Sequence, residues 1–215
     1  MNKSFSFDLF NRMPIVGIMR NIPSQYIHTI AEKYYSAGLT CLEITMNSPD
    51  AEKSIALLAE LYPGKLNIGA GTVCSMNDLE KALAANARFI VTPIINEEVI
   101  KTCVSENIPI FPGAYTPSEI YRAWSLGAPM IKLFPAGDLK PTYIKEVLAP
   151  LSDVHLMPTG GINLDNFTNY LELGARGVGV GSQLFPKAAI EAEDWDALGT
   201  VYTQFVNKYR AFVAK

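Results

Sequence analysis

The stretch CLEITMNSPDAEKSIALLAELY, residues 41–62, joins a short apolar run to a longer segment with helical spacing. Its first six residues alternate and are rich in side chains that favour a buried strand. In the part that follows, apolar residues recur at the three- and four-residue steps of an amphipathic helix. The stretch therefore predicts one strand followed by one helix.

The same two patterns recur along the chain. We predict strands at 15–19, 41–46, 67–72, 89–93, 108–112, 130–134, 155–159 and 177–181. We predict helices near 23–37, 50–62, 76–85, 96–106, 117–126, 141–149, 164–173 and 194–213. Capping residues at Ser75, Thr116 and Asn163, and glycines at 38, 127 and 174, support these helix ends.

Strand–helix–strand units place their strands in parallel. Eight such units in 215 residues predict a closed (β/α)₈ barrel (the TIM barrel) in a single domain, 1–215. An open doubly wound sheet is the alternative, but Met19-Arg20-Asn21-Ile22-Pro23 after the first strand contains no GxGxxG. Leu9, Phe10 and Met13 have helical spacing, which predicts a short N-terminal helix that closes the barrel floor.

Composition excludes several classes of protein. Hydrophobic residues make up 49% of the chain and charged residues 18%, which is typical of a globular protein and not of a disordered one. The 18 basic and 21 acidic residues give a net charge of −3 without a basic run, so we expect no nucleic-acid or membrane partner. Three separated cysteines and the absence of a signal-peptide pattern predict a cytoplasmic protein.

Two charged residues fall within predicted strands. In Pro129-Met-Ile-Lys-Leu-Phe-Pro135, alternation sends Lys132 to the side opposite Ile131 and Leu133, into the barrel interior. Burial there lowers the pKa of an amine, and a neutral amine is a nucleophile. A structural lysine paired with a carboxylate is the alternative reading.

Glu43 follows the same logic, with Leu42 and Ile44 on the helix side of its strand. An interior carboxylate is costly unless it is paired or neutral. Glu43 is therefore either the partner of Lys132 in a static salt bridge or a proton shuttle beside an amine nucleophile.

Glycine-rich turns follow the last two predicted strands, in Pro158-Thr-Gly-Gly-Ile162 and Gly177-Val-Gly-Val-Gly-Ser182. Barrels bind phosphate through backbone N–H groups of the loops at this place. A tight turn that merely needs glycine is the alternative. The two histidines, His28 and His155, lack metal-ligand spacing and are read as structural, so we expect neither metal nor cofactor.

From about residue 14 to 213 the chain resembles the 2-keto-3-deoxy-6-phosphogluconate (KDPG) aldolase family. The motifs that carry the resemblance are Leu42-Glu-Ile-Thr45, Gly69-Ala-Gly-Thr-Val73, Phe111-Pro-Gly113, Thr116-Pro-Ser-Glu119, Lys132-Leu-Phe-Pro-Ala136 and Pro158-Thr-Gly-Gly-Ile162. The resemblance implies a homotrimeric class I aldolase with Lys132 as the Schiff-base lysine and Glu43 as the general acid/base. By position it also implies pocket residues at Thr72, Pro93, Phe134 and Thr159, and a phosphate site at Gly160, Gly161, Gly181 and Ser182.

One position departs from the family pattern. Asn47 stands where the gluconate-type enzymes have an arginine for the pyruvate carboxylate, and the galactonate branch is similar to this chain in having asparagine there and an arginine after the first strand. Arg20 is at that place, whereas Thr159 looks like the gluconate branch. We favour Arg20 as the carboxylate ligand, because a guanidinium forms two hydrogen bonds with a carboxylate. The configuration preferred at C4 stays open.

The expected function is cleavage of KDPG to pyruvate and glyceraldehyde 3-phosphate. The C4 epimer, 2-keto-3-deoxy-6-phosphogalactonate, and 4-hydroxy-2-oxoglutarate are alternative substrates. A non-catalytic barrel that binds phosphorylated metabolites is a more remote alternative, and a phosphosugar isomerase is disfavoured because no histidine lies at a predicted strand end on the rim.

Overall fold

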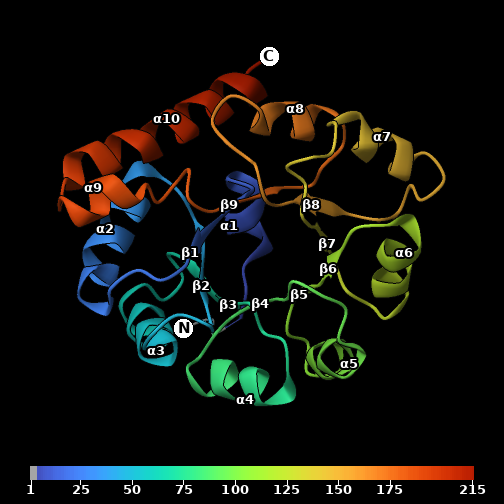
Figure 1. Ribbon diagram of the computed structural model, residues 1–215, viewed down its shortest axis with the longest axis horizontal. Coiled ribbons are helices and arrows are strands. Elements are labelled where there is room, and N and C mark those ends of the chain that lie inside the picture. Colours follow the sequence, from blue (N-terminus) through green and yellow to red (C-terminus); the bar gives the residue numbers. More distant parts are fainter. Residues whose placement is uncertain (1–3) are drawn as a thin grey trace.

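The computed structural model describes residues 4–215, in which strands form a central barrel and helices surround it (Figure 1). The strands are β1 (Ile15–Met19), β2 (Cys41–Thr45), β3 (Asn67–Gly71), β4 (Ile90–Val91), β5 (Ile110–Phe111), β6 (Gly113–Ala114), β7 (Ile131–Leu133), β8 (Leu156–Pro158) and β9 (Val178–Val180). The helices are α1 (Phe7–Arg12), the 3₁₀ turn η1 (Ser24–Tyr26), α2 (Ile27–Ala37), α3 (Ala51–Leu61), α4 (Met76–Ala84), α5 (Glu97–Ser105), α6 (Pro117–Ser125), α7 (Thr142–Leu148), α8 (Phe167–Glu172), α9 (Lys187–Glu191) and α10 (Trp195–Val213). Within residues 4–215, no helix combines the length and apolarity needed to cross a bilayer.

The strands pair in two parallel ladders that together close the barrel. One ladder has the order β5-β4-β3-β2-β1-β9 and the other the order β6-β7-β8. β5 and β6 are two parts of one extended segment, separated at Pro112, which has no N–H to donate. At the other junction a parallel bridge joins Thr159 to Gly179. The predicted (β/α)₈ barrel is therefore confirmed.

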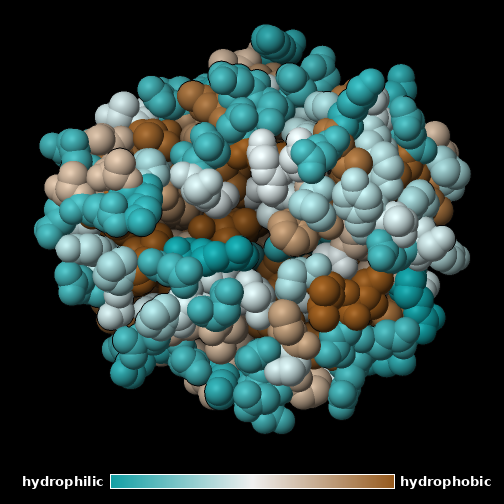
Figure 2. Space-filling view, viewed as in Figure 1, coloured by the Kyte–Doolittle hydropathy of each residue, from teal (hydrophilic) through white to brown (hydrophobic). Residues whose placement is uncertain are grey.

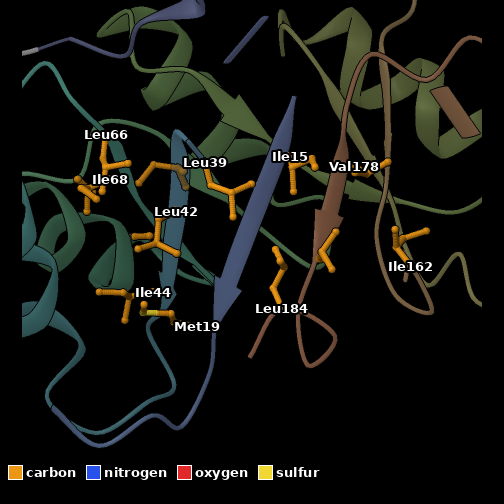
Figure 3. Packing of buried hydrophobic residues seen from close by; sticks show 14 of the residues in the cluster. Ile15, Met19, Leu39, Leu42, Ile44, Leu66, Ile68, Ile162, Val178 and Leu184 are labelled. Carbon is orange, nitrogen blue, oxygen red and sulfur yellow. The ribbon is translucent and has the colours of Figure 1, made fainter. Parts of the chain in front are cut away.

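The larger apolar core lies between the strands and the surrounding helices. It contains the outward-facing residues of each strand, such as Leu42 and Ile44, which lie on the same side of β2 (Figure 3). Ile15 of β1 and Val178 of β9 belong to the same cluster and are fully buried. Burial of each such side chain stabilises the fold by about 1.5–3 kcal/mol.

A second, smaller core fills the lower part of the barrel. Its members are Phe5, Phe10, Val16, Cys41, Phe89, Val91, Phe111, Met130 and Met157. The Phe5 ring packs edge-on against Phe89 and Phe111, with centroid distances of 5.4 and 5.9 Å. α1 lies at the middle of the ring of helices (Figure 1), so the predicted N-terminal helix that closes the floor is confirmed.

The predicted helix boundaries hold where a cap fixes them. Ser75 and Thr116 each form a capping box, and Gly38, Gly127 and Gly174 have the left-handed φ of a helix end. The helix predicted at 164–173 begins only at Phe167, because Asn163 and Asn166 form a turn through their own side chains. The short helix α9 was not predicted, because five residues are too few to show a helical repeat.

Candidate active site

β7 places Lys132 inside the barrel, because alternation directs Ile131 and Leu133 toward the helices. The Lys132 residue is 3% exposed, and its Nζ lies 4.7 Å from the centroid of the Phe134 ring. The ring quadrupole attracts an ammonium at this distance. The inward orientation that the alternation predicts is the one observed.

The pKa of the Lys132 ammonium is lowered. Burial is the largest cause, since it disfavours the charged form. Glu43 opposes this effect, the Arg20 guanidinium adds to it, and the Cys74 thiol opposes it. A lowered pKa increases the fraction of neutral amine at neutral pH, and only the neutral amine attacks a carbonyl.

β2 buries Glu43 on its interior face, where the residue is 1% exposed. Its Oε2 has no hydrogen-bond partner among residues 4–215. Burial raises the pKa of this carboxyl to about 7, although Lys132 and Arg20 act in the opposite direction. A carboxyl with this pKa both accepts and donates a proton near neutral pH.

Lys132 and Glu43 influence each other electrostatically but form no salt bridge in the described part of the chain. The static ion pair that the sequence left open is therefore not the arrangement observed. An ion pair would favour the protonated amine, and without one burial keeps the pKa of Lys132 lowered.

A cavity of about 860 Å³ opens above Lys132. Of the predicted site residues, its lining includes Arg20, Lys132, Phe134, Thr159, Gly160, Gly161, Gly181 and Ser182. Figure 2 shows a hollow near the centre of this face, with apolar residues inside it and hydrophilic residues around its edge. The barrel rim thus brings Lys132, Arg20 and both glycine turns to one space.

The two glycine turns form the part of this cavity beside β8 and β9. Gly160 and Gly161 have φ angles of 91° and 71°, in the left-handed region that favours glycine. A β-carbon on Gly161 would lie 2.5 Å from Cα of Gly137, so the neighbouring loop also requires glycine there. The backbone N–H groups of Gly161 and Ser182 have no hydrogen-bond acceptor among residues 4–215, which leaves them available to an anion.

The lining of this cavity does not include the other four predicted residues, which are Glu43, Asn47, Thr72 and Pro93. Thr72 accepts a long hydrogen bond of 3.5 Å from Nη2 of Arg20. Pro93 is half-buried, and its backbone is packed against Gly113. Asn47 is exposed in the turn after β2, outside the cavity lining, whereas Arg20 lines it.

The cavity also contains residues that the sequence analysis did not select. Lys187, Ile190 and Glu191 belong to the short helix α9, and Tyr26 comes from η1. α9 is too short to show a repeat, although Pro186 before it is a helix-start signal. η1 lies within the helix predicted at 23–37, but nothing in that pattern indicated that Tyr26 lines a cavity.

The two histidines lie away from this cavity. His28 packs near the Tyr62 ring, and His155 contacts the Trp124 ring and the carbonyl oxygen of Pro129. Among residues 4–215, no three His, Cys, Asp or Glu side chains gather into a group that could hold a metal ion.

A closed parallel barrel with a buried lysine, a buried carboxyl and glycine turns at the same rim is typical of enzymes that act on phosphorylated carbonyl compounds. Residues 8–201 match the family KDPG and KHG aldolase, and the chain belongs to this family. It is an aldolase, a carbon–carbon lyase, so a purely binding barrel is excluded.

Relatives in this family are named for different substrates. The chain is 33% identical over 175 residues to the 2-dehydro-3-deoxy-6-phosphogalactonate aldolase of Escherichia coli, covering 81% of this chain and 85% of that protein. It is 35% identical over 198 residues to the 2-dehydro-3-deoxy-phosphogluconate aldolase of Haemophilus influenzae, covering 91% and 92%. The structure of the KDPG aldolase of Legionella pneumophila, with pyruvate captured as a covalent carbinolamine, superimposes with a TM-score of 0.83, 29% identity and coverage of 91% and 95%.

Proposed function

We propose that the protein cleaves a six-carbon 2-keto-3-deoxy-6-phospho sugar acid into pyruvate and glyceraldehyde 3-phosphate. The observation that carries the proposal is the pair of buried groups at the barrel rim. The pKa of Lys132 is lowered, that of Glu43 is raised to about 7, and no salt bridge ties them together within the described chain. This is the pairing that an amine nucleophile and its proton shuttle require.

In the proposed reaction, neutral Lys132 attacks the C2 ketone, and loss of water gives a protonated imine. Glu43 takes the proton of the C4 hydroxyl, directly or through a water molecule. The C3–C4 bond then breaks, and its electron pair moves toward the imine to give an enamine while the aldehyde leaves. Glu43 returns a proton to C3, and water hydrolyses the imine to release pyruvate and the free amine. The sequence of steps needs no metal or cofactor.

The cavity also offers a ligand for each end of the substrate. Arg20 is the proposed ligand of the pyruvate carboxylate, because it lines the cavity and Asn47 does not. Gly160, Gly161, Gly181 and Ser182 are the proposed phosphate site, with free N–H groups in their turns. The Phe134 ring lies beside the Lys132 amine, Thr159 is the proposed contact for the sugar hydroxyls, and Thr72 and Pro93 are the other proposed pocket residues. Phosphate binding far from the scissile bond positions that bond for cleavage.

Borohydride reduction in the presence of pyruvate tests the covalent step. We expect mass spectrometry to find a three-carbon adduct on Lys132. Lys132→Met should abolish both the adduct and pyruvate release. Lys145→Met replaces an exposed lysine of α7 and should change neither. An active wild type whose Lys132 stays unmodified would refute the mechanism.

The preferred substrate is KDPG or its C4 epimer. The galactonate epimer is favoured by Arg20 with Asn47, and KDPG is favoured by Thr159. A lactate-dehydrogenase-coupled assay with KDPG, the epimer and 4-hydroxy-2-oxoglutarate ranks the three. We expect Ser182→Ala to lower kcat/KM for the phosphorylated substrates by roughly ten- to a hundredfold, since one hydrogen bond to a charged group contributes about 1.5–3 kcal/mol. An unchanged value would show that the Ser182 hydroxyl takes no part in phosphate binding.

We further propose that the protein acts as a cytoplasmic homotrimer of one-domain chains. The resemblance to the family and the unpaired cysteines Cys41, Cys74 and Cys103 support this proposal. Ile94, Tyr115 and Tyr121 are exposed apolar residues, with exposed fractions of 50%, 39% and 56%, and are available for contact between copies. Sedimentation equilibrium tests the oligomeric state.

A further inference from the structure

The loop after β1 is tied to the turn after β2 by one side chain, Ser48. Its Oγ accepts a hydrogen bond of 2.9 Å from the backbone N–H of Asn21, the residue that follows Arg20. The same Oγ lies 2.8 Å from Oγ1 of Thr45, with one hydroxyl donating to the other. The backbone N–H of Ser48 donates to the carbonyl oxygen of Thr45 at 2.9 Å, which fixes Ser48 to the end of β2.

The position of Ser48 matters because Arg20 itself is weakly held. The only hydrogen bond that the structure gives its guanidinium within residues 4–215 is the 3.5 Å contact with Thr72, which is at the limit of hydrogen-bond length. Asn21 has a φ of 53°, a left-handed conformation that is uncommon for non-glycine residues but that asparagine tolerates. The Ser48 hydrogen bond fixes the backbone in this turn, at the residue next to Arg20.

The loop that Ser48 fixes places Arg20 beside Lys132 at the cavity. Arg20 lines the same cavity as Lys132, and its charge adds to the lowering of the Lys132 pKa and opposes the rise of the Glu43 pKa. Thr45, the inner partner of Ser48, is fully buried on the same interior face of β2 as Glu43. The hydrogen bonds of Ser48 therefore connect the loop that follows Arg20 at the end of β1 with β2, the strand that carries Glu43.

We propose that Ser48 is a positioning residue that holds Arg20 in place to bind the carboxylate of the keto acid. The inference rests on the proposed function, in which Arg20 is the carboxylate ligand. Ser48 touches no substrate in this role. It lowers the conformational freedom that Arg20 loses on binding, so its removal weakens keto-acid binding and leaves the chemistry of Lys132 intact.

The rate of borohydride trapping on Lys132, measured against pyruvate concentration, tests the proposal. We expect Ser48→Ala to raise the half-saturating pyruvate concentration by about three- to tenfold, the loss of roughly one hydrogen bond, with little change in the maximal rate. Ser48→Thr keeps the hydroxyl and should restore the wild-type value. A merely structural defect would instead lower the amount of enzyme that is trapped and leave the half-saturating concentration unchanged.

A double-mutant cycle shows whether Ser48 acts through Arg20. In an Arg20→Ala background, Ser48→Ala should cause no further increase in the half-saturating concentration. Ser105→Ala is the matched control, since the Ser105 hydroxyl also bonds a backbone group, the carbonyl of Thr102, but on the exposed end of α5. It should leave pyruvate trapping unchanged.

The outcomes separate this inference from the proposed function. If the wild type is not trapped on Lys132, or if Arg20→Ala binds pyruvate normally, the proposed site fails and the role of Ser48 fails with it. If the wild type is trapped and Arg20→Ala weakens trapping, the site stands and Ser48 is judged alone. A normal half-saturating concentration in Ser48→Ala, or an equal effect of Ser48→Ala without Arg20, would then overturn the positioning role.

Discussion

A β-carbon on Gly71 would lie 2.3 Å from Oε1 of Glu43. The Glu43 carboxylate of β2 therefore occupies the space that a side chain at position 71 of β3 would fill. Gly71 does not have the positive φ that demands glycine, and the requirement is therefore for room rather than for backbone freedom. Gly179 of β9 has the same relationship with Thr159, whose Oγ1 would lie 2.3 Å from an added β-carbon. Glycines on the interior face thus leave room for the polar side chains of the neighbouring strands.

Gly71→Ala should displace the Glu43 carboxylate and lower turnover. We expect kcat for pyruvate release to fall by about a hundredfold, the lower end of what general acid/base catalysis contributes. The coupled assay measures kcat, and circular dichroism shows whether the barrel is still folded. Wild-type turnover in a folded Gly71→Ala variant would mean that the carboxylate does not need this space.

Gly199→Ala is the matched control for this experiment. Gly199 lies inside α10, and an added β-carbon would meet only Cδ of Lys33, at 3.7 Å. Turnover should be unchanged, and the free energy of unfolding should rise by up to about 1 kcal/mol, because alanine is the better helix former.

Strand alternation made the buried groups predictable. A strand has only two faces, so the apolar neighbours of Lys132 and Glu43 were enough to place both side chains inside the barrel. The glycine turns were predictable because φ angles such as those of Gly160 and Gly161 favour glycine.

The distances between elements were not predictable from the sequence. Lys132 and Glu43 come from β7 and β2, and whether they form a salt bridge depends on packing that no local pattern encodes. The bond between Asn21 and Ser48 joins residues 27 positions apart. A single serine in a turn carries no signal that it will meet a backbone N–H of another loop.

Loss of the hydroxyl group should change the free energy of unfolding differently for two buried tyrosines, Tyr34 and Tyr202. The Tyr34 hydroxyl accepts from the N–H of Gly17 at 3.0 Å and donates to the carbonyl oxygen of Cys41 at 2.6 Å, bridging β1 and β2. Tyr34→Phe leaves both backbone groups without a partner and should lower the free energy of unfolding by roughly 2 kcal/mol or more. Urea denaturation measures the change.

Tyr202→Phe is the internal comparison. The Tyr202 hydroxyl is buried without a hydrogen-bond partner in the described structure, and its ring packs edge-on against Tyr34 at 5.3 Å. Removing an unpaired buried hydroxyl should leave stability unchanged or raise it by about 1 kcal/mol. Equal losses in the two variants would show that ring packing, and not the bridge, accounts for the effect of Tyr34.

The raised pKa of Glu43 predicts how stability depends on pH. The carboxyl has an ordinary pKa of 4.5 and a pKa of about 7 in the folded protein. Between these values the unfolded chain has released the proton and the folded chain has kept it, so raising the pH favours unfolding. The contribution of Glu43 is fully present below pH 4.5 and is lost by about pH 7, for a total of roughly 3 kcal/mol.

Glu43→Gln isolates this contribution, because glutamine has a similar shape and does not titrate. The free energy of unfolding of the wild type, relative to Glu43→Gln, should fall as the pH rises from 4.5 to 7 and then level off. Urea denaturation at a series of pH values measures the difference. Parallel curves for the two proteins would contradict the raised pKa.

Asn67 should control the docking of the N-terminal segment at the barrel floor. Its amide accepts from the N–H of Ser6 and donates to the carbonyl oxygen of Ser6, both at 2.8 Å, and the residue is 3% exposed. Asn67→Asp keeps the acceptor but points lone pairs at the Ser6 carbonyl oxygen, so it should destabilise the fold by about 2 kcal/mol. Hydrogen exchange of residues 4–12 should accelerate, while kcat stays near the wild-type value because the active site lies at the opposite rim.

Asn207→Ala, on the exposed face of α10, is the control and should change neither the exchange rate nor kcat. Unchanged exchange in Asn67→Asp would mean that the Phe5 and Phe10 rings hold the segment without the amide.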